Sequence, residues 1–359
     1  MTAVGGDTKK RRRQGVTIRH VAADAGVSLQ TVSRVINDAP NVRSEVKQRV
    51  QAAIDKLGYV PSIAAQRMGG SRSYLILAMN DRDRTIADWR ERQGTDWIDQ
   101  MLLGGMLKAA EFGYRLIFEL VDTHDDHLER ELRATLAALQ PDGVILTPPH
   151  SENPQITALL EEMGTAFARI GSLQPGAGLA LSMDEEGAAA AATAHLADLG
   201  HRRIAFISGS PEYSLSKRRA QGWRAEMQQR KLPTDGLLAD GDFSFESGSR
   251  AARALLEGRD PPTAVIASND RMALATLALA HELGLEVPRD LSLLSFDNTP
   301  IVRYTQPPLT AVDQPVAETT ALAVEMIIRS LRREELPPQP MIVEAGLVHR
   351  LSTAPPRGA

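Results

Sequence analysis

The sequence predicts two kinds of structure in one chain: a small all-α helix-turn-helix headpiece and a larger two-lobed α/β core built on two doubly wound parallel sheets. Short helical patterns fill residues 17–58, and β-type and helical segments alternate from Tyr74 onward. A length of 359 residues is also too great for one ordinary core. We therefore expect the headpiece at 1–60, a linker at 61–72 and the core at 73–359.

Three short helices are predicted in the headpiece. Thr17 and Ser28 are favourable N-cap residues, and Gly26 suits the left-handed turn that ends the first helix, at about 18–25. A second helix follows Ser28, and a third begins at Ser44 and ends at Gly58. Apolar side chains at three- and four-residue spacing predict one shared core, which includes Val21, Ala22, Val32 and Val35.

The outward side chains of the second helix suit recognition of DNA bases. Gln30 can pair with an adenine edge, Arg34 with the N7 and O6 atoms of guanine, and Leu29 can contact a thymine methyl group. Ser33 can hydrogen-bond a base or a phosphate. On geometry alone, a small structural helical bundle is the alternative.

Charge is distributed unevenly along the chain. Residues 1–72 carry 13 Lys and Arg against 5 Asp and Glu, whereas the remainder carries 28 against 40, so a balance of +8 precedes one of −12. A basic segment favours contact with a phosphate backbone. A solvated charged tail is the alternative interpretation.

Composition excludes several classes of protein. The chain contains no cysteine, which excludes disulfides, thiolate metal sites and cysteine nucleophiles. The basic residues at 9–13 are not followed by the apolar stretch of a secretory signal, and no later segment is long and apolar enough to span a bilayer. We therefore expect a cytoplasmic, nucleoid-associated protein without membrane contact.

The linker has a helical pattern of about two turns at 62–68, followed by Gly69, Gly70 and Ser71. Such a helix is too short to be stable alone in water, so we expect it to order only when a partner holds it. A flexible tether without a role in DNA binding is the alternative.

Repeated βαβ units are predicted in the core, because runs apolar on both faces suit parallel strands covered by helices. One lobe is expected at about 73–172 plus 312–340, and the other at about 173–311 plus 341–359. The predicted strands are Leu75–Met79, Leu116–Val121, Val144–Thr147, Ala166–Ile170, Ile204–Ser208, Ala264–Ala267 and Leu291–Phe296.

Polar residues directly after these strands are candidates for a ligand site, because ligands of such sheets bind beyond the carboxyl ends of the strands. These residues are Asn80, Arg169, Ser208, Ser268, Asn269, Asp270, Asp297 and Asn298. The segment 80–97 is highly charged and carries Trp89 and Trp97, so either it lines the cleft or it is a solvated insertion.

No enzymatic signature is present. The chain lacks a phosphate-binding glycine fingerprint, a Gly-x-Ser-x-Gly elbow and metal-spaced histidines, and His124 and His127 have no third ligand. We expect no catalytic residues, no metal and no cofactor.

The headpiece resembles that of LacI/GalR transcriptional repressors over its whole length. The matching segments are Thr17–Asn37 (TIRHVAADAGVSLQTVSRVIN), Val42–Ser44 (VRS) and Gly58–Pro61 (GYVP). The core resembles the periplasmic-binding-protein-like core of the same family at Lys217–Trp223 (KRRAQGW), Ala267–Ala275 (ASNDRMALA), Gly284–Ser292, Phe296–Asn298, Pro307–Thr310 and His349–Thr353.

The resemblance implies a set of DNA contacts. Leu29, Gln30 and Arg34 hold positions that read major-groove bases in the family, while the positions commonly placed at the backbone are those of Thr17, Ser28, Thr31, Ser33 and Asn37. The linker corresponds to the hinge helix, which wedges an apolar side chain into the minor groove. Its DNA-contacting residues here are Ala65 and Met68, and Met68 replaces the usual leucine.

The resemblance also implies an effector site between the lobes. Arg219, Asn269 and Asp297 hold positions that hydrogen-bond the effector, and Phe243 holds the position of an aromatic that stacks on it. Asn80, Trp97 and Arg169 complete the expected set, while Asp270 is expected to cap a helix. A lobe-surface salt bridge for Arg219 and simple core packing for Phe243 are the alternatives. Arg169 stands where relatives often have aspartate, which favours an anionic effector.

Taken together, these features predict a homodimeric repressor of carbohydrate-utilisation genes. Its partners would be a pseudo-palindromic double-stranded operator and a sugar or sugar-derived effector, and effector binding would change operator affinity through the lobe angle and the hinge. The alternative function is a solute-binding protein of a transporter, which would need an export signal.

Overall fold

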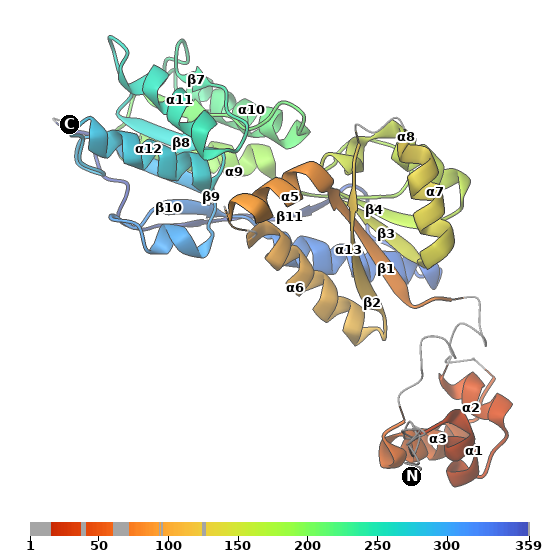
Figure 1. The fold of residues 1–359 in the computed structure, drawn as a ribbon. Helices are drawn as coiled ribbons and strands as arrows, with labels where there is room; N and C mark the ends of the chain where they lie inside the picture. Colours follow the sequence, from red (N-terminus) through yellow and green to blue (C-terminus); the bar gives the residue numbers. More distant parts are fainter. Residues whose placement is uncertain are drawn as a thin grey trace, which may run out of the picture. The chain divides into compact units, whose positions relative to one another are not determined.

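The structure is a computed structural model that describes residues 16–36, 41–59, 72–92, 94, 96–123 and 127–357. The chain divides into two compact units, Met1–Tyr74 and Leu75–Ala359, which we describe separately (Figure 1). The predicted hinge helix, with Ala65 and Met68, and the predicted DNA contact Asn37 lie outside the described residues.

The headpiece contains the three predicted helices, α1 (Ile18–Ala25), α2 (Leu29–Ile36) and α3 (Ser44–Leu57). Gly26 and Gly58 end α1 and α3 in the left-handed conformation, with φ of 63° and 59°. The three helices share one core, in which Val21, Val32 and Val50 are fully buried.

The helix caps of the headpiece include one contact that was not expected. Ser28 caps α2 as predicted, because its Oγ accepts a hydrogen bond from the Thr31 amide at 3.1 Å. At α1, Thr17 is the N-cap residue as predicted, and its amide also donates to Nδ1 of His20 at 3.0 Å, so the imidazole takes part in the cap.

The first lobe of the core is a six-stranded sheet of order β11-β5-β4-β3-β1-β2, and all its pairings are parallel. Its strands are β1 (Leu75–Asp81), β2 (Arg115–Val121), β3 (Gly143–Leu146), β4 (Ala166–Ile170), β5 (Leu179–Met183) and β11 (Met341–Val343). Its helices are α5 (Arg82–Glu91), α6 (Asp96–Glu111), α7 (Leu128–Leu139), η1 (His150–Glu152), α8 (Pro154–Glu162) and α13 (Val316–Leu331).

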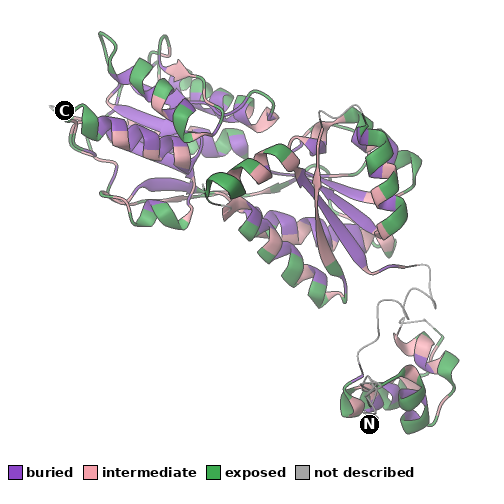
Figure 2. Cartoon of the chain, viewed as in Figure 1, coloured by how far each residue is buried: buried purple, intermediate pink, exposed green. Residues whose placement is uncertain are grey.

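Alternating side chains of this sheet are buried on both faces. Leu77 and Met79 of β1 pack in one cluster with α7 and α8, while the intervening Ile76 and Ala78 are equally buried on the other side of the strand. Helices α6 and α13 cover that other face (Figures 1 and 2). Burial on both faces explains the continuous apolar runs in the sequence.

The second lobe is a six-stranded sheet of order β12-β10-β9-β8-β6-β7. Its strands are β6 (Ile204–Ile207), β7 (Leu238–Ala239), β8 (Ala264–Ala267), β9 (Ser292–Asp297), β10 (Thr310–Asp313) and β12 (Gly346–Val348). Its helices are α9 (Glu185–Asp198), α10 (Ser214–Gln229), α11 (Phe245–Leu256), α12 (Asp270–Glu282) and η2 (Pro300–Arg303).

The predicted fold class is confirmed, with two adjustments. All seven predicted strands form, but the sequence patterns missed β5, β7, β10, β11 and β12. The edge strand β12 runs antiparallel to β10, so the second sheet is not wholly parallel. These strands were missed because they are short or partly exposed and carry no long apolar run.

We expected the chain to cross from one lobe to the other at about residues 172, 311 and 340. In the structure, each crossing lies later in the sequence. Strand β5, at 179–183, belongs to the first sheet, so the first crossing follows Met183. The second crossing follows Asp313 at the end of β10, and β11 returns the chain to the first sheet before β12 joins the second. Among the described helices, none is long and apolar enough to cross a membrane.

Helices α6 and α13 pack closely at Gly104. A Cβ atom at Gly104 would lie 1.9 Å from the backbone carbonyl oxygen of Ala317, which is far inside van der Waals contact. A side chain at residue 104 therefore requires the two helix backbones to move apart.

We predict that Gly104→Ala lowers the free energy of unfolding of the core by about 1–3 kcal/mol, measured by urea denaturation. The matched control is Gly346→Ala, where an added Cβ meets no atom within 4 Å. We expect the control to change stability by less than about 0.5 kcal/mol. Equal midpoints for the two variants would contradict the close packing of α6 on α13.

Candidate functional site

A cavity of about 650 Å³ lies between the two lobes of the core. Its lining comes from the carboxyl ends of strands of both sheets: Asn80 and Asp81 end β1, Thr147 follows β3, Asn269 follows β8, and Asp297 ends β9. The volume is within the range of about 300–1,000 Å³ that is usual for small-molecule sites. Six predicted effector residues line the cavity: Asn80, Trp97, Arg219, Phe243, Asn269 and Asp297.

An ion pair with Glu185 holds the side chain of Arg219, on α10, in place. Its Nε lies 2.6 Å from Oε2 of Glu185, and both side chains are 2% exposed. Its Nη1 donates to the carbonyl of Ser268 at 2.6 Å, and its guanidinium lies 4.5 Å from the centroid of the Phe296 ring. Removing either partner would leave an unpaired buried charge, so this is not the surface salt bridge considered above.

Asn269 positions other parts of the site. Its Oδ1 accepts a hydrogen bond from the Met272 amide at 2.9 Å and so caps α12, while its Nδ2 donates to the Phe243 carbonyl at 2.9 Å. Phe243 has a positive φ of 71° and packs its ring edge-to-face against Tyr213, with centroids 5.8 Å apart. Phe243 is therefore largely buried and still lines the cavity.

Two neighbouring carboxyl groups, Asp270 and Asp297, form the polar floor of the second lobe. Oδ2 of Asp270 accepts hydrogen bonds from the amide and the hydroxyl of Thr299, at 2.7 and 2.8 Å. Burial and the neighbouring Asp297 raise the pKa of Asp270 to about 7. Burial also raises the pKa of Asp297, against the opposing charges of Arg219 and Arg84. Asp270 does not cap α12, because Asn269 is the N-cap residue.

The segment 80–97 is largely helical. Asp81 caps α5 by accepting a hydrogen bond from the Arg84 amide at 3.0 Å, and α6 begins at Asp96. Trp97 reaches the cavity, whereas Trp89 is 48% exposed and lies beside Phe118, with ring centroids 6.3 Å apart. The two tryptophans thus have different surroundings.

Helix α5 brings Arg84 and Asp88 to the cavity, and neither was among the predicted site residues. The guanidinium carbon of Arg84 lies 5.5 Å from the ring centroid of Tyr213 and 5.1 Å from that of Phe243. The sequence signal for α5 was present, since Asp81 is a favourable N-cap residue ahead of a segment with alanine, arginine and glutamate.

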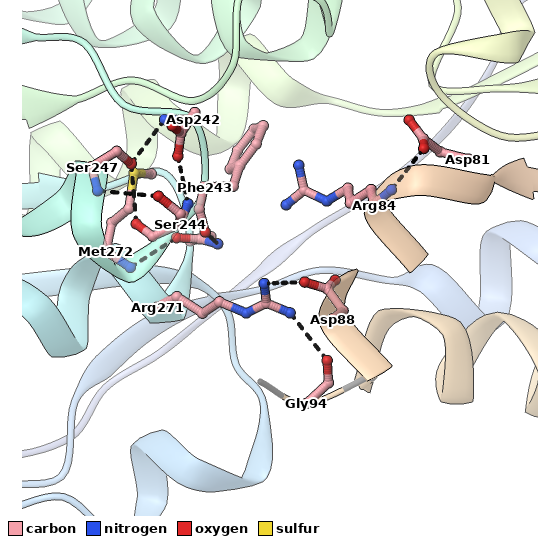
Figure 3. Close-up of polar contacts among 11 residues, drawn as sticks. Asp81, Arg84, Asp88, Gly94, Asp242, Phe243, Ser244, Ser247, Arg271 and Met272 are labelled. Atoms are coloured by element: carbon pink, nitrogen blue, oxygen red, sulfur yellow. Dashed lines mark hydrogen bonds and ion pairs between the residues drawn. The ribbon is translucent and has the colours of Figure 1, made fainter. Parts of the chain in front are cut away.

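Polar contacts join the two lobes at two places. Arg271, on α12, pairs with Asp88 at 2.6 Å and donates to the carbonyl of Gly94 at 3.0 Å (Figure 3). At the second place, Arg218 of α10 donates to the carbonyl of Gly171, which follows β4, at 2.5 Å. A change in the lobe angle would therefore have to break or rearrange charged contacts.

Arg169 is the predicted effector residue that the structure does not bring to the cavity. Its guanidinium is buried at the end of β4, where it donates to Oγ of Ser172 at 3.2 Å and to the carbonyl of Gln174 at 2.8 Å. Because these local acceptors hold it, Arg169 braces the loop after β4 and does not line the ligand space.

In the headpiece, α2 presents the predicted base-reading residues on one surface. Leu29, Gln30 and Arg34 are exposed, whereas Val32 between them is fully buried. Ser28 and Thr31 hydroxyls lie 2.9 Å apart and bond to each other at the start of the helix. The helix thus has a buried face that fixes it and an outer face available for contact.

Comparisons with known proteins identify both units. Residues 17–62 match the family described as bacterial regulatory proteins, lacI family, and residues 193–353 match the periplasmic binding protein-like domain. The HTH-type transcriptional regulator DegA of Bacillus subtilis is 32% identical over 344 residues, which cover 94% of this chain and 98% of that protein.

Two solved structures are also similar. A complex of the transcriptional regulator CelR with cellobiose has a TM-score of 0.70 and 27% identity, covering 94% of this chain and 99% of that one. A lac repressor dimer bound to operator and the anti-inducer ONPF has a TM-score of 0.73 and 25% identity, covering 95% and 100%.

The raised pKa of Asp270 predicts how the stability of the core depends on pH. Because the folded pKa of about 7 exceeds the ordinary value of 3.8, the folded state binds the proton more tightly, and stability falls as pH rises from about 4 to about 7. Asp270→Asn removes this ionisation. Its stability relative to the wild type should therefore increase between pH 5 and pH 8, by about 1–3 kcal/mol.

Thermal or urea unfolding at a series of pH values measures this difference, with Asp290→Asn as the control. Hydrogen bonding to the Glu286 amide helps to lower the pKa of Asp290, so its contribution is already complete above pH 5. A pH-independent difference between Asp270→Asn and the wild type would contradict a neutral carboxyl group at residue 270.

Proposed function

Because the chain belongs to the lacI family of bacterial regulatory proteins, we propose that it is a repressor whose operator affinity is switched by a sugar or sugar-derived effector bound between the lobes. The observation that carries the proposal is the cavity of about 650 Å³ lined by both lobes of a chain whose headpiece matches the lacI family and has an exposed face on α2. Its relatives are transcriptional regulators, and the chain is a regulator rather than an enzyme.

The cavity has the groups that a polyhydroxylated ligand requires. Asp297 can accept hydrogen bonds from hydroxyl pairs, Arg219 can donate, and the Phe243 ring offers an apolar surface to sugar C–H groups. The similar CelR structure contains cellobiose, which supports a carbohydrate-derived effector and a role in carbohydrate utilisation.

The cross-lobe contacts supply the coupling between the effector and DNA. An effector that binds more tightly to one conformation of the two lobes shifts the population toward that conformation. The contacts that Arg271 and Arg218 make between the lobes change with it. A coupling free energy of about 1–3 kcal/mol is enough to change operator affinity by roughly 5- to 150-fold. We propose that residues 61–72 transmit this change to the headpiece.

The headpiece favours this function over that of a transporter's solute-binding protein, which would share the two-lobed core. Residues 17–62 match a family of DNA regulators, and a solute-binding protein has no use for such a domain. The similar lac repressor was solved bound to operator as a dimer, which supports double-stranded operator DNA and a second copy as partners.

We propose that the second copy packs on α6. Leu103, Met106 and Leu107 are 50%, 55% and 60% exposed, and their spacing places them on one side of that helix. An apolar strip of this kind on a helix is typical of a protein interface. Two-fold symmetry then presents two headpieces to a pseudo-palindromic operator.

Arg34→Ala tests the DNA-binding function. On duplexes selected in vitro, the variant should lose about 1–3 kcal/mol of binding free energy and accept several bases at one position of each half-site. The charge-matched control is Arg49→Ala, on the exposed surface of α3, which should weaken all sequences alike if it has any effect. Absence of DNA binding by the wild type at low salt would contradict the proposed function.

Met106→Asp tests the dimer interface by sedimentation velocity. Burying an unpaired aspartate in an apolar interface costs more free energy than the apolar contacts contribute. The variant should therefore sediment as a monomer under conditions in which the wild type is a dimer. Gln155→Asp introduces the same charge on the exposed surface of α8, which covers the other face of the sheet, and should remain dimeric. If both variants sediment as dimers, the interface lies elsewhere.

A further inference from the structure

Two of the four arginines that line the cavity are paired with carboxylates. Arg219 pairs with Glu185, and Arg271 pairs with Asp88. Within the described part of the chain, no carboxylate lies within ion-pair distance of the other two lining arginines, Arg84 and Arg92. Arg92 is exposed at the end of α5, where water compensates its charge, whereas Arg84 is half-buried.

Two aromatic rings hold the Arg84 guanidinium in place. The rings of Tyr213 and Phe243 lie 5.5 and 5.1 Å from its central carbon, within the distance at which a cation is attracted to a ring. Figure 3 shows the side chain extending from α5 toward Phe243 of the second lobe. The rings attract the cation, but they offer no anionic oxygen to its N–H groups.

Carboxyl groups that line the same cavity as Arg84 are engaged elsewhere or are disfavoured in their charged form by burial. Asp81 accepts hydrogen bonds from the Arg84 amide and, at 3.4 Å, from the Tyr213 hydroxyl. Burial raises the pKa values of both Asp270 and Asp297. Asp297 attracts Arg84 only across a longer distance, so within the described residues no carboxylate oxygen is bonded to the Arg84 N–H groups, and these donors are available to a ligand anion.

We propose that Arg84 binds a carboxylate or phosphate group of the effector, so that the effector is an acidic carbohydrate. A guanidinium presents parallel donors that match the paired oxygens of these groups. The acidic group would lie against α5, and the hydroxyl groups of the same molecule against Arg219 and Asp297. This inference rests on the proposed function, since it names the class of effector for the same cavity.

Arg84 also replaces Arg169 as the source of a preference for anions. Arg169 is held by Ser172 and Gln174 outside the cavity, whereas Arg84 lines it. Because α5 lies in the charged segment 80–97, the preference is carried by that segment and not by the strand ends.

Calorimetric titration of the full-length protein tests the proposal. The probes are glucose, glucuronate, gluconate and glucose 6-phosphate, and galactose, galacturonate and galactose 6-phosphate. We expect at least one acidic sugar to bind about tenfold or more tightly than its neutral parent. Comparing the sugar acids with the sugar phosphates shows whether the site prefers a carboxylate or a phosphate group.

Variants on α5 assign the preference to Arg84. Arg84→Gln should lose about tenfold or more in affinity for the preferred acid and change binding of the neutral parent by less than about threefold. Arg84→Lys should keep part of the preference, because it retains the charge but not the paired donors. Arg90→Gln removes the same charge from an exposed position of α5 outside the cavity lining and should bind as the wild type does. Circular dichroism verifies that each variant is folded.

Equal affinity for neutral and acidic congeners, or a preference that survives in Arg84→Gln, would overturn the inference while leaving the proposed function intact. If no sugar or acidic sugar binds although the protein binds its operator, the proposed class of effector is wrong and the inference fails with it.

Discussion

The direction of the strands is the constraint on which the ligand site depends. In each lobe, nearly every strand pairing is parallel, so the carboxyl ends of the strands meet at one edge of each sheet. The two edges face the same cavity, and the chain crosses between lobes near Met183, Asp313 and Val343. Groups far apart in sequence, such as Asn80, Arg219 and Asp297, therefore line one space, and any motion of one lobe changes the space that both enclose.

Charged contacts across the cavity suit a structure that has to change shape. The side chains of the Arg271–Asp88 pair are 23% and 19% exposed, so solvent screens this pair more than a fully buried one, and a ligand can offset its loss. The pair between Arg219 and Glu185 is fully buried within the second lobe, where breaking it would be far more costly. The rigid pair thus holds the binding surface, while the weaker pair lies where the lobes must separate.

Much of the fold could be predicted from the sequence, because glycine and cap residues mark the headpiece helices and long apolar runs mark the central strands. Strands β7, β11 and β12 could not be predicted, because a strand of two or three residues is too short to show a hydrophobic periodicity. The four side chains that the family resemblance placed in the cavity lie there, whereas Arg169, expected from its place after a strand, does not, because local acceptors that only the structure reveals hold it. Arg84 and Asp88 were missed because no helix was predicted in the charged segment 80–97, whereas residues 82–91 form α5.

In the proposed mechanism, the angle between the two lobes controls operator affinity. The natural absence of cysteine allows a direct test, because Asp88→Cys with Arg271→Cys supplies the only two thiols of each chain, one on each side of the cavity. A short bifunctional thiol reagent would then lock the lobes together, and fluorescence anisotropy would measure affinity for an operator selected in vitro. We expect the locked and unlocked proteins to differ in operator affinity by about fivefold or more. Equal affinities would contradict it.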